Sequence, residues 1–324
     1  MSSMSLLKIS NYSMSFRLES GTYKTLNNIS LTIDKKSMVA LVGESGCGKS
    51  MTAMSILRLL PKNAIIDSGA IIFNNQNLLD LNDSAMRKIR GTNIALIPQD
   101  PMTSLNPLYT IGNQLLEVIT KNNDITHNDA IKKAIEVLDI VKIPNAKNKL
   151  SAYPHEFSGG MKQRAIIAMA LATNAELIIA DEPTTALDVT IQSQIMNILN
   201  EIKETLGTSI LLISHELNLV GQYADEINVM YAGKIVERSK TKDFFKTPLH
   251  PYSVALLNAL PAHNIGNSVL KTIDGQPPNI QDKIVGCRFN PRCSKIIKGI
   301  CDKNEPENIM IYPEHYTECF LYKN

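Results

Sequence analysis

Short apolar runs alternate with polar turns and with stretches of helical spacing along most of the chain. The runs at 38–42, 93–97, 177–180 and 209–214 are typical of buried strands. Apolar residues recur at helical spacing in five other stretches and predict helices at 49–60, 111–120, 128–141, 161–173 and 190–205. Strands that alternate with helices predict an α/β fold with a parallel sheet. A helical subdomain at about 100–160 interrupts this pattern, and short strands with turns are expected before about residue 90.

A glycine-rich loop follows the strand at 38–42 and leads into the helix at 49–60. It fits the pattern G-x-x-x-x-G-K-[ST] with Gly43, Glu44, Ser45, Gly46, Cys47, Gly48, Lys49 and Ser50. Its glycines let backbone N–H groups surround a phosphate, and the helix N-terminus adds partial positive charge. Lys49 is expected to reach the β- and γ-phosphates, and Ser50, followed by Met51, to ligate Mg²⁺. The loop therefore predicts a site for a nucleoside triphosphate.

Cys47 lies inside this loop and has two interpretations. It is expected to be a small filler. Its place at a helix N-terminus leaves open a lowered pKa and a reactive thiol shielded by nucleotide.

Two carboxylates, Asp181 and Glu182, end the buried strand at 177–180. Beside a phosphate loop, Asp181 is expected to hold Mg²⁺ through its water shell. Glu182 is expected to polarise the attacking water. A solvated pair at a strand end is the alternative for either residue, and the phosphate loop in the same chain favours the functional interpretation.

A second anion site is predicted where the helix at 161–173 begins. Ser158 is a suitable N-cap, and Gly159 and Gly160 expose backbone N–H groups. One chain with one phosphate loop has no evident use for a second anion site.

In this order and spacing, the three motifs resemble the ATP-binding cassette of ABC transporters over about the first 240 residues. The resemblance implies a head-to-tail dimer in which Ser158, Gly159 and Gly160 contact the γ-phosphate of the partner subunit. It also implies that Gln99 touches Mg²⁺ and the attacking water, that Asp188 crosses the dimer interface and that His215 contacts the γ-phosphate. Each has a plain alternative, namely a polar strand-end Gln, an N-capping Asp and a satisfied core His.

The same resemblance implies an aromatic side chain stacked on the adenine, for which Phe16 is expected and Tyr23 is the alternative. Phe157 and Met161 depart from the usual Leu and Gln of the signature, and this form is associated with peptide-importer ATPases. The departure leaves the contacts of Met161 open.

Composition bounds the remaining functions. A chain of 324 residues is expected to hold two domains, a nucleotide-binding domain at 1–245 and an extension at 246–324. The net charge of +2 gives no electrostatic case for nucleic acid as a partner. No apolar run approaches the length of about 18 residues that spans a bilayer, and the first eight residues lack a signal-peptide pattern. We therefore expect a cytoplasmic chain that reaches the membrane through other subunits.

Four of the five cysteines lie in the extension, at Cys287, Cys293, Cys301 and Cys319, with five, seven and seventeen residues between them. Disulfides are disfavoured in the cytosol, and the absence of C-x-x-C argues against a zinc ribbon. Four thiolates suit an iron–sulfur cluster or an irregular Zn²⁺ site, and the plain alternative is four buried thiols.

The runs 181–190, 250–253 and 287–293 extend the resemblance to the ATPase subunits of oligopeptide and dipeptide permeases, over nearly the whole chain. It implies import of di- or oligopeptides powered by ATP, a second homologous and non-identical ATPase, two transmembrane permease subunits that contact 100–114, and an extracytoplasmic peptide-binding protein. It places the chain at the cytoplasmic face of the inner membrane. Some members carry a 4Fe–4S cluster on four such cysteines. The alternatives are an importer of nickel or another small solute, a soluble ABC ATPase, and a P-loop kinase or GTPase, against which the signature and His215 argue.

Overall fold

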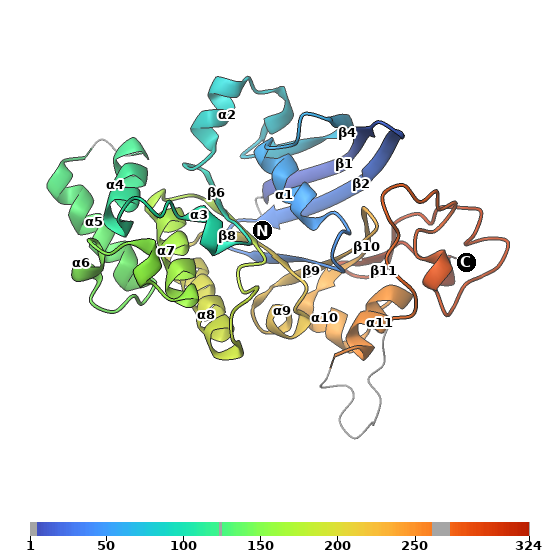
Figure 1. Ribbon diagram of the computed structural model, residues 1–324. Coiled ribbons are helices and arrows are strands. Elements are labelled where there is room, and N and C mark those ends of the chain that lie inside the picture. The colour runs from blue at the N-terminus through green and yellow to red at the C-terminus, as the bar shows by residue number, and fades with distance from the viewer. Residues whose placement is uncertain (1–4, 123–124, 261–272, 324) are drawn as a thin grey trace. The chain divides into compact units, whose positions relative to one another are not determined.

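The structure is a computed structural model that describes residues 5–122, 125–260 and 273–323 (Figure 1). The described residues fall into two units. Unit 1 contains 34–37, 80–122 and 125–212, and unit 2 contains 5–33, 38–79, 213–260 and 273–323. The stretch at 264–267, whose Asn/Gly-rich sequence predicts a link, lies outside the described residues.

Unit 2 contains an antiparallel sheet in the order β2-β1-β4-β5 (Figure 1). Its strands are β1 (Ser5–Leu18), β2 (Gly21–Asp34), β4 (Ala64–Phe73) and β5 (Gln76–Asn77). β1 and β2 each have 14 residues, so the short strands predicted for this region are wrong in length. β2 alternates between buried and less buried residues over 29–34, as a half-buried strand requires, whereas β1 shifts register near Ser13 and buries 12–15 in succession. The buried apolar side chains are Leu6, Leu7, Ile9, Tyr12, Met14, Leu26, Ile29, Leu31 and Ile33.

Five strands of unit 2 form a mixed sheet in the order β11-β12-β10-β9-β3. They are β3 (Met38–Val42), β9 (Glu226–Tyr231), β10 (Lys234–Lys240), β11 (Ile309–Tyr312) and β12 (His315–Thr317). β3 pairs parallel with β9, and the other pairs are antiparallel. Every residue of β3 is buried, which explains its continuous apolar sequence.

Helices of unit 2 follow the strands closely. They are α1 (Lys49–Leu57), α9 (Leu217–Tyr223), α10 (Thr241–Lys246) and α11 (Pro251–Asn258), with the 3₁₀ turns η4 (Asn290–Arg292) and η5 (Phe320–Tyr322). α1 stops three residues before the predicted end, because Arg58 adopts a left-handed conformation with φ of 49° and caps the helix.

Unit 1 has strands in the order β8-β7-β6, of which β6 and β7 pair parallel. Their bounds are β6 (Ile94–Ile97), β7 (Leu177–Asp181) and β8 (Ser209–Ser214), and β8 continues into unit 2. Its helices are α2 (Asp83–Ile89), α3 (Pro101–Ser104), α4 (Ile111–Asn122), α5 (His127–Ile140), α6 (Ala146–Lys149), α7 (Gly159–Ala172) and α8 (Val189–Leu206), with the 3₁₀ turn η2 (Pro154–Glu156) and, at the border with unit 2, η1 (Leu78–Asp80). The predicted strands and helices of this unit are confirmed to within two residues at each end. A helical region within 101–156 is also confirmed.

α7 is the central helix of unit 1. It packs against α3, α4, α5, α8 and β6 (Figure 1). Its apolar residues point to several sides, since Ile166, Ile167, Ala170 and Leu171 are all buried. A helix surrounded on most sides needs no polar stripe. Among the described residues no helix combines the length and the apolar character needed to cross a bilayer.

The hairpin turn between β9 and β10 gives a stability prediction. Gly233 has φ of +81°, and an added Cβ would lie 2.0 Å from the backbone oxygen of Thr25. Gly233→Ala should lower the free energy of unfolding by about 2–4 kcal/mol, from left-handed strain plus overpacking. Gly299→Ala is the matched control, because its φ is +82° and nothing lies within 4 Å of the added Cβ. It should cost only about 1 kcal/mol. Urea unfolding of both variants measures this, and equal losses would contradict the role of the contact.

Candidate functional site

The phosphate loop of unit 2 connects the buried end of β3 to α1. Its crest, Ser45 and Gly46, is exposed, while Lys49 is buried at its base. Lys49 Nζ donates to the carbonyl oxygen of Gly43 at 2.8 Å and to that of Glu44 at 3.1 Å. The Lys49 ammonium therefore links the last part of the loop to its first two residues. Gly48 occupies the N-cap of α1 and has a left-handed backbone, so the helix starts where the sequence predicts. Ser50 and Met51 follow in its first turn.

Gly43 is required by a close backbone approach. A Cβ at this position would lie 2.2 Å from the backbone oxygen of Met230 in β9 and 2.9 Å from the sulfur of Cys47. No side chain fits there, and φ is +155°. The first glycine of the motif thus serves packing against β9.

Cys47 is a buried filler, as expected. Burial raises the pKa of its thiol, and the nearby Lys49 ammonium lowers it less. The alternative interpretation of Cys47, a reactive thiol with a lowered pKa, is therefore wrong. The backbone oxygen of Cys47 accepts the N–H of Gly233 at 2.8 Å, which ties the loop to the β9–β10 turn.

In unit 1, Asp181 and Glu182 occupy the end of β7. Asp181 is buried, and Glu182 is half-buried with φ of +48°, a left-handed conformation that is costly for a residue with a side chain. Its carboxylate accepts the Nε2–H of Gln99 at 2.9 Å and the hydroxyl of Thr185 at 3.0 Å, both on Oε2. The structure thus brings together two predicted site residues, Gln99 and Glu182.

Thr185 is the residue that sequence reasoning missed here. It lies three residues after Glu182 in a tight turn, where Thr185 N–H also donates to the Glu182 carbonyl oxygen at 3.1 Å. A hydroxyl three positions beyond a strand-end carboxylate was the available signal. Thr185 orients the carboxylate that is proposed to polarise water.

The Ser158-Gly159-Gly160 signature begins α7 as predicted. Ser158 Oγ accepts the N–H of Met161 at 3.3 Å, so Ser158 is the N-cap. Gly160 is buried, since an added Cβ would lie 2.7 Å from Cγ2 of Ile191 in α8. Ser158 and Gly159 are exposed. The exposed start of a helix with a free approach is suited to a ligand or to a partner subunit.

Asp188 caps α8. Its Oδ1 accepts the N–H of Ile191 at 3.0 Å, which is the plain structural interpretation of this residue. It is also exposed, next to Val189, whose side chain is 75% exposed. Because Asp188 is exposed, it can also contact a partner subunit, and its role at a dimer interface stays a prediction.

The remaining nucleotide residues lie in unit 2. His215 is exposed directly after β8, so it is not a buried core histidine. Phe16 is half-buried near the end of β1, opposite Ala64 of β4. Tyr23 is also half-buried, and its hydroxyl donates to the Ser20 carbonyl oxygen at 3.0 Å within the β1–β2 turn. Phe16 thus stays the preferred adenine partner, as a prediction.

The cysteines of the extension are all unpaired thiols. Across the described ranges, no three His, Cys, Asp or Glu side chains are grouped closely enough to hold a metal ion. The predicted cluster site at Cys287, Cys293, Cys301 and Cys319 is therefore not confirmed.

Electrostatics nevertheless couples the four sulfur atoms. Burial raises the pKa of the Cys287 thiol to about 11, and the Cys301, Cys319 and Cys293 thiols raise it further. Burial likewise raises the pKa of Cys319 to about 11, with Cys293 and Cys301 adding to the effect. The four thiols thus lie within electrostatic range of one another.

Backbone N–H groups point to these sulfur atoms. Phe289, Lys295 and Leu321, each two residues after a cysteine, hydrogen-bond to Cys287, Cys293 and Cys319 and lower the pKa of those thiols. The N–H of Ile297 donates to Cys301 Sγ at 3.4 Å. Donors aimed at sulfur stabilise thiolates, the form in which cysteine binds metals.

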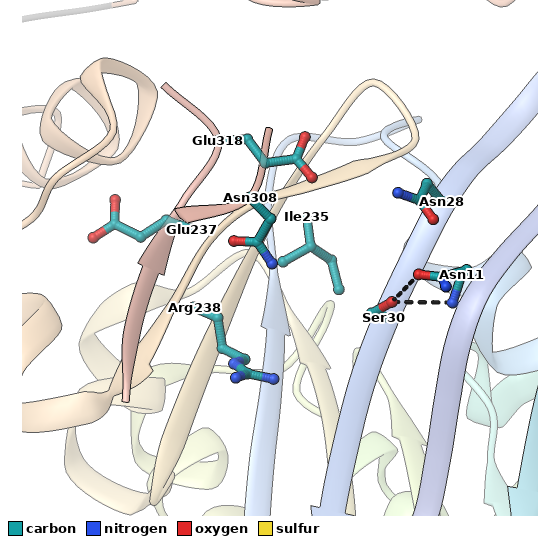
Figure 2. A pocket seen from close by; sticks show the side chains of 8 residues that line it. All are labelled: Asn11, Asn28, Ser30, Ile235, Glu237, Arg238, Asn308 and Glu318. Carbon is teal, nitrogen blue, oxygen red and sulfur yellow. Dashed lines mark hydrogen bonds between the residues drawn. The ribbon is translucent and has the colours of Figure 1, made fainter. Parts of the chain in front are cut away.

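A small polar hollow in unit 2 contains none of the residues predicted from the sequence. Figure 2 shows its lining, which includes Glu237, Glu318 and Asn308 around a volume of about 90 Å³. Glu237 is fully buried and accepts the N–H groups of Leu249 and His250 at 2.9 and 2.7 Å, with His315 Nε2 at 2.8 Å. The Glu237 carboxylate therefore joins β10 to the start of α11 and to β12.

Comparisons with known proteins agree with this description. Residues 26–185 match the family model described as ABC transporter, and residues 236–301 match the oligopeptide/dipeptide transporter, C-terminal region. The chain is 43% identical to the dipeptide transport ATP-binding protein DppD of Bacillus subtilis, over 98% of this chain and 94% of that protein. It is 42% identical to the oligopeptide transport ATP-binding protein OppD of Salmonella typhimurium, over 97% and 93%.

Solved structures give the same class. A dimeric ATP-binding cassette in a post-hydrolysis state with ADP and Pi aligns with a TM-score of 0.65 at 26% identity, over 72% of this chain and 98% of that one. The fold and motifs define an ABC-type P-loop ATPase with a mixed sheet and helices. The chain belongs to the family of ATP-binding subunits of oligopeptide and dipeptide ABC transporters.

Glu182 gives the prediction for hydrolysis. Glu182→Gln should preserve ATP binding but lower ATP hydrolysis by about 10²-fold or more, since an amide cannot take the proton of the attacking water. Steady-state ATPase rates of the assembled transporter measure this. Glu201→Gln on α8, which removes an exposed ion pair with Lys142, is the control and should leave the rate unchanged. A near-normal rate in Glu182→Gln would refute the assignment.

Proposed function

We propose that this chain is the ATP-hydrolysing subunit that powers import of di- or oligopeptides by an ABC transporter. The observation that supports this most strongly is the joint match of the cassette and of a peptide-transporter C-terminal region in one chain, with relatives named for dipeptide and oligopeptide transport. We infer that selectivity lies in the binding protein and the permease, so an importer of nickel or another small solute is the competing function.

We propose roles for the residues from the family motifs and from the contacts described above. Lys49 and the N–H groups of 43–50 hold the triphosphate, and Phe16 stacks on its adenine. Ser50, Gln99 and Asp181 would hold Mg²⁺, which would supply positive charge to the phosphates. Glu182, oriented by Gln99 and Thr185, takes the proton from the attacking water, and His215 contacts the γ-phosphate.

A second subunit completes the site. Ser158 and Gly159 are exposed at the start of α7, and Asp188 is exposed at the start of α8. We propose that these positions face a homologous, non-identical ATPase, whose bound ATP receives the N–H groups of the Ser158–Gly160 signature. ATP closes the dimer, and hydrolysis and product release reopen it. The phosphate loop of one subunit and the Ser158–Gly160 signature of the other bind the same nucleotide, so neither subunit alone forms a complete site.

The surface proposed to receive the permease is apolar and exposed. Leu108 is 80% exposed, and Met102 and Tyr109 are also among the exposed apolar side chains. Exposed apolar groups of this size mark interaction sites. They lie in 100–114, beyond Gln99, so permease movement can reach the Glu182 carboxylate through one hydrogen bond. The chain would then lie at the cytoplasmic face of the inner membrane, attached through two permease subunits and served by an extracytoplasmic peptide-binding protein.

We further propose the division into a nucleotide-binding domain at 1–245, with its helical subdomain at about 100–160, and an extension at 246–324. In this extension Cys287, Cys293, Cys301 and Cys319 would hold a 4Fe–4S cluster, with Zn²⁺ as the alternative. The N–H groups directed at the sulfur atoms support a thiolate ligand set. The cluster's role would be structural, in a segment with few buried apolar residues.

Reconstitution tests the transport function. The chain should be combined in proteoliposomes with the partner ATPase, the permease subunits and the binding protein encoded beside it. A di- or oligopeptide on the binding protein should stimulate ATP hydrolysis several-fold, because closure of the ATPase dimer is coupled to substrate delivery. Nickel is the control solute. Stimulation by nickel and not by peptides would replace the proposal by its competitor.

Metal analysis tests the cluster. Full-length protein purified without oxygen should contain about four irons and four sulfides per chain, and Cys293→Ser should lose most of them and lower thermal stability. Cys47→Ser, outside the extension, is the matched control and should retain the iron. Zinc in place of iron would favour the alternative, and no metal at all would contradict both.

A further inference from the structure

Glu44 is the one acidic residue of the phosphate loop 43–50. A carboxylate in a loop that binds a triphosphate repels the ligand unless a cation neutralises it. Its side chain is 23% exposed, so solvent screens this charge only in part. The charge of Glu44 therefore needs a partner.

Arg292 of the extension is that partner. Its Nη1 lies 2.7 Å from Oε2 of Glu44, and its Nη2 lies 3.1 Å from Oε1, a bidentate pair. The side chain of Arg292 is only 6% exposed. Its Nε and Nη2 also donate to the backbone oxygens of Asp274 and Gly275 at 2.9 and 3.3 Å. These contacts fix the guanidinium plane toward the loop, and a lysine could not reproduce them.

The backbone of Glu44 is held by the same extension. Its N–H donates to the hydroxyl of Tyr252 in α11 at 2.9 Å. Tyr252 is fully buried, and its N–H donates to His250 Nδ1 at 3.1 Å. Burial lowers the pKa of His250 to about 4, so this ring is neutral and can accept. Both the side chain and the backbone of Glu44 thus depend on residues beyond 245.

The loop 287–293 connects these contacts to the cysteines. Phe289 is buried, with its ring centroid 5.1 Å from that of Tyr231 and 5.3 Å from that of Tyr252. Arg292 directly precedes Cys293. Any movement of this short loop therefore shifts Arg292 relative to Glu44 and disturbs the aromatic packing around Tyr252.

We propose that Arg292 is a positioning residue for the phosphate loop, which neutralises Glu44 and couples the loop 287–293 to ATP binding. The inference rests on the proposed nucleotide role of 43–50. Because coupling is reciprocal, ATP binding must also stabilise 287–293. Arg292 itself does not touch the nucleotide in this scheme, and its effect passes through Glu44.

Equilibrium binding of a fluorescent ATP analogue to the full-length chain tests this. Arg292→Gln should weaken binding about fivefold to tenfold, because it leaves a carboxylate unneutralised near the phosphates. Glu44→Gln added to Arg292→Gln should restore most of the affinity, since it removes the same charge. A damaged fold would not be rescued in this way. Lys298→Gln, an exposed lysine of the same extension, is the control and should bind like the wild type.

Hydrogen exchange gives a second readout on the unmodified chain. ATP should slow amide exchange across 287–293, and Arg292→Gln should abolish this protection. Wild-type affinity in Arg292→Gln, or no recovery in the double variant, would overturn the proposal. Lys49→Ala distinguishes failure of this coupling from failure of the nucleotide site. Unchanged ATP binding in that variant would refute the nucleotide site itself.

Discussion

A loop that binds a triphosphate must hold its backbone fixed before the ligand arrives, and here β9 and its turn supply that constraint. The absence of a Cβ at Gly43 lets the loop touch the backbone of Met230, and the oxygen of Cys47 accepts the N–H of Gly233. The same turn receives Asn27 N–H on the Gly233 oxygen and Arg288 Nη1 on the Ala232 oxygen. One two-residue turn thus serves the loop, the antiparallel sheet and the extension.

The extension is built into the sheet of unit 2 rather than appended to it. β12 pairs with β10, and the buried Glu237 carboxylate joins β10 to the start of α11 and to His315. A buried carboxylate with three donors is costly to move, since losing a partner would leave an uncompensated charge. This explains how a segment with little regular structure can present Tyr252 and Arg292 to the phosphate loop in a fixed orientation.

Local patterns predicted much of this fold and site. Apolar runs followed by Gly43 or by Asp181 located strand ends, and Ser158 and Asp188 are the caps that their types predict. The length of β1 and β2 could not be predicted, because the polar residues that interrupt their apolar alternation resemble turns. The pair of Glu44 and Arg292 had no local signal, as 248 positions separate the two residues. Such a contact is set by topology, which periodicity does not encode.

Two opposing influences act on the ionisation of the cysteine thiols in the extension. Burial and neighbouring sulfur atoms disfavour thiolates, which raises the pKa of Cys287 and Cys319. Yet each of the four sulfur atoms has a backbone N–H directed at it, an arrangement that favours negative charge. A neutral thiol gains less from such a donor than a thiolate does, so these N–H groups stabilise mainly the ionised sulfur. Cys301 and Cys319 are buried and Cys287 and Cys293 half-buried, and the nearby Lys295 ammonium lowers the pKa of Cys293 against the effect of burial. Since no three His, Cys, Asp or Glu side chains of the described residues are grouped as a metal site, the bound cluster stays a prediction that rests on these donors.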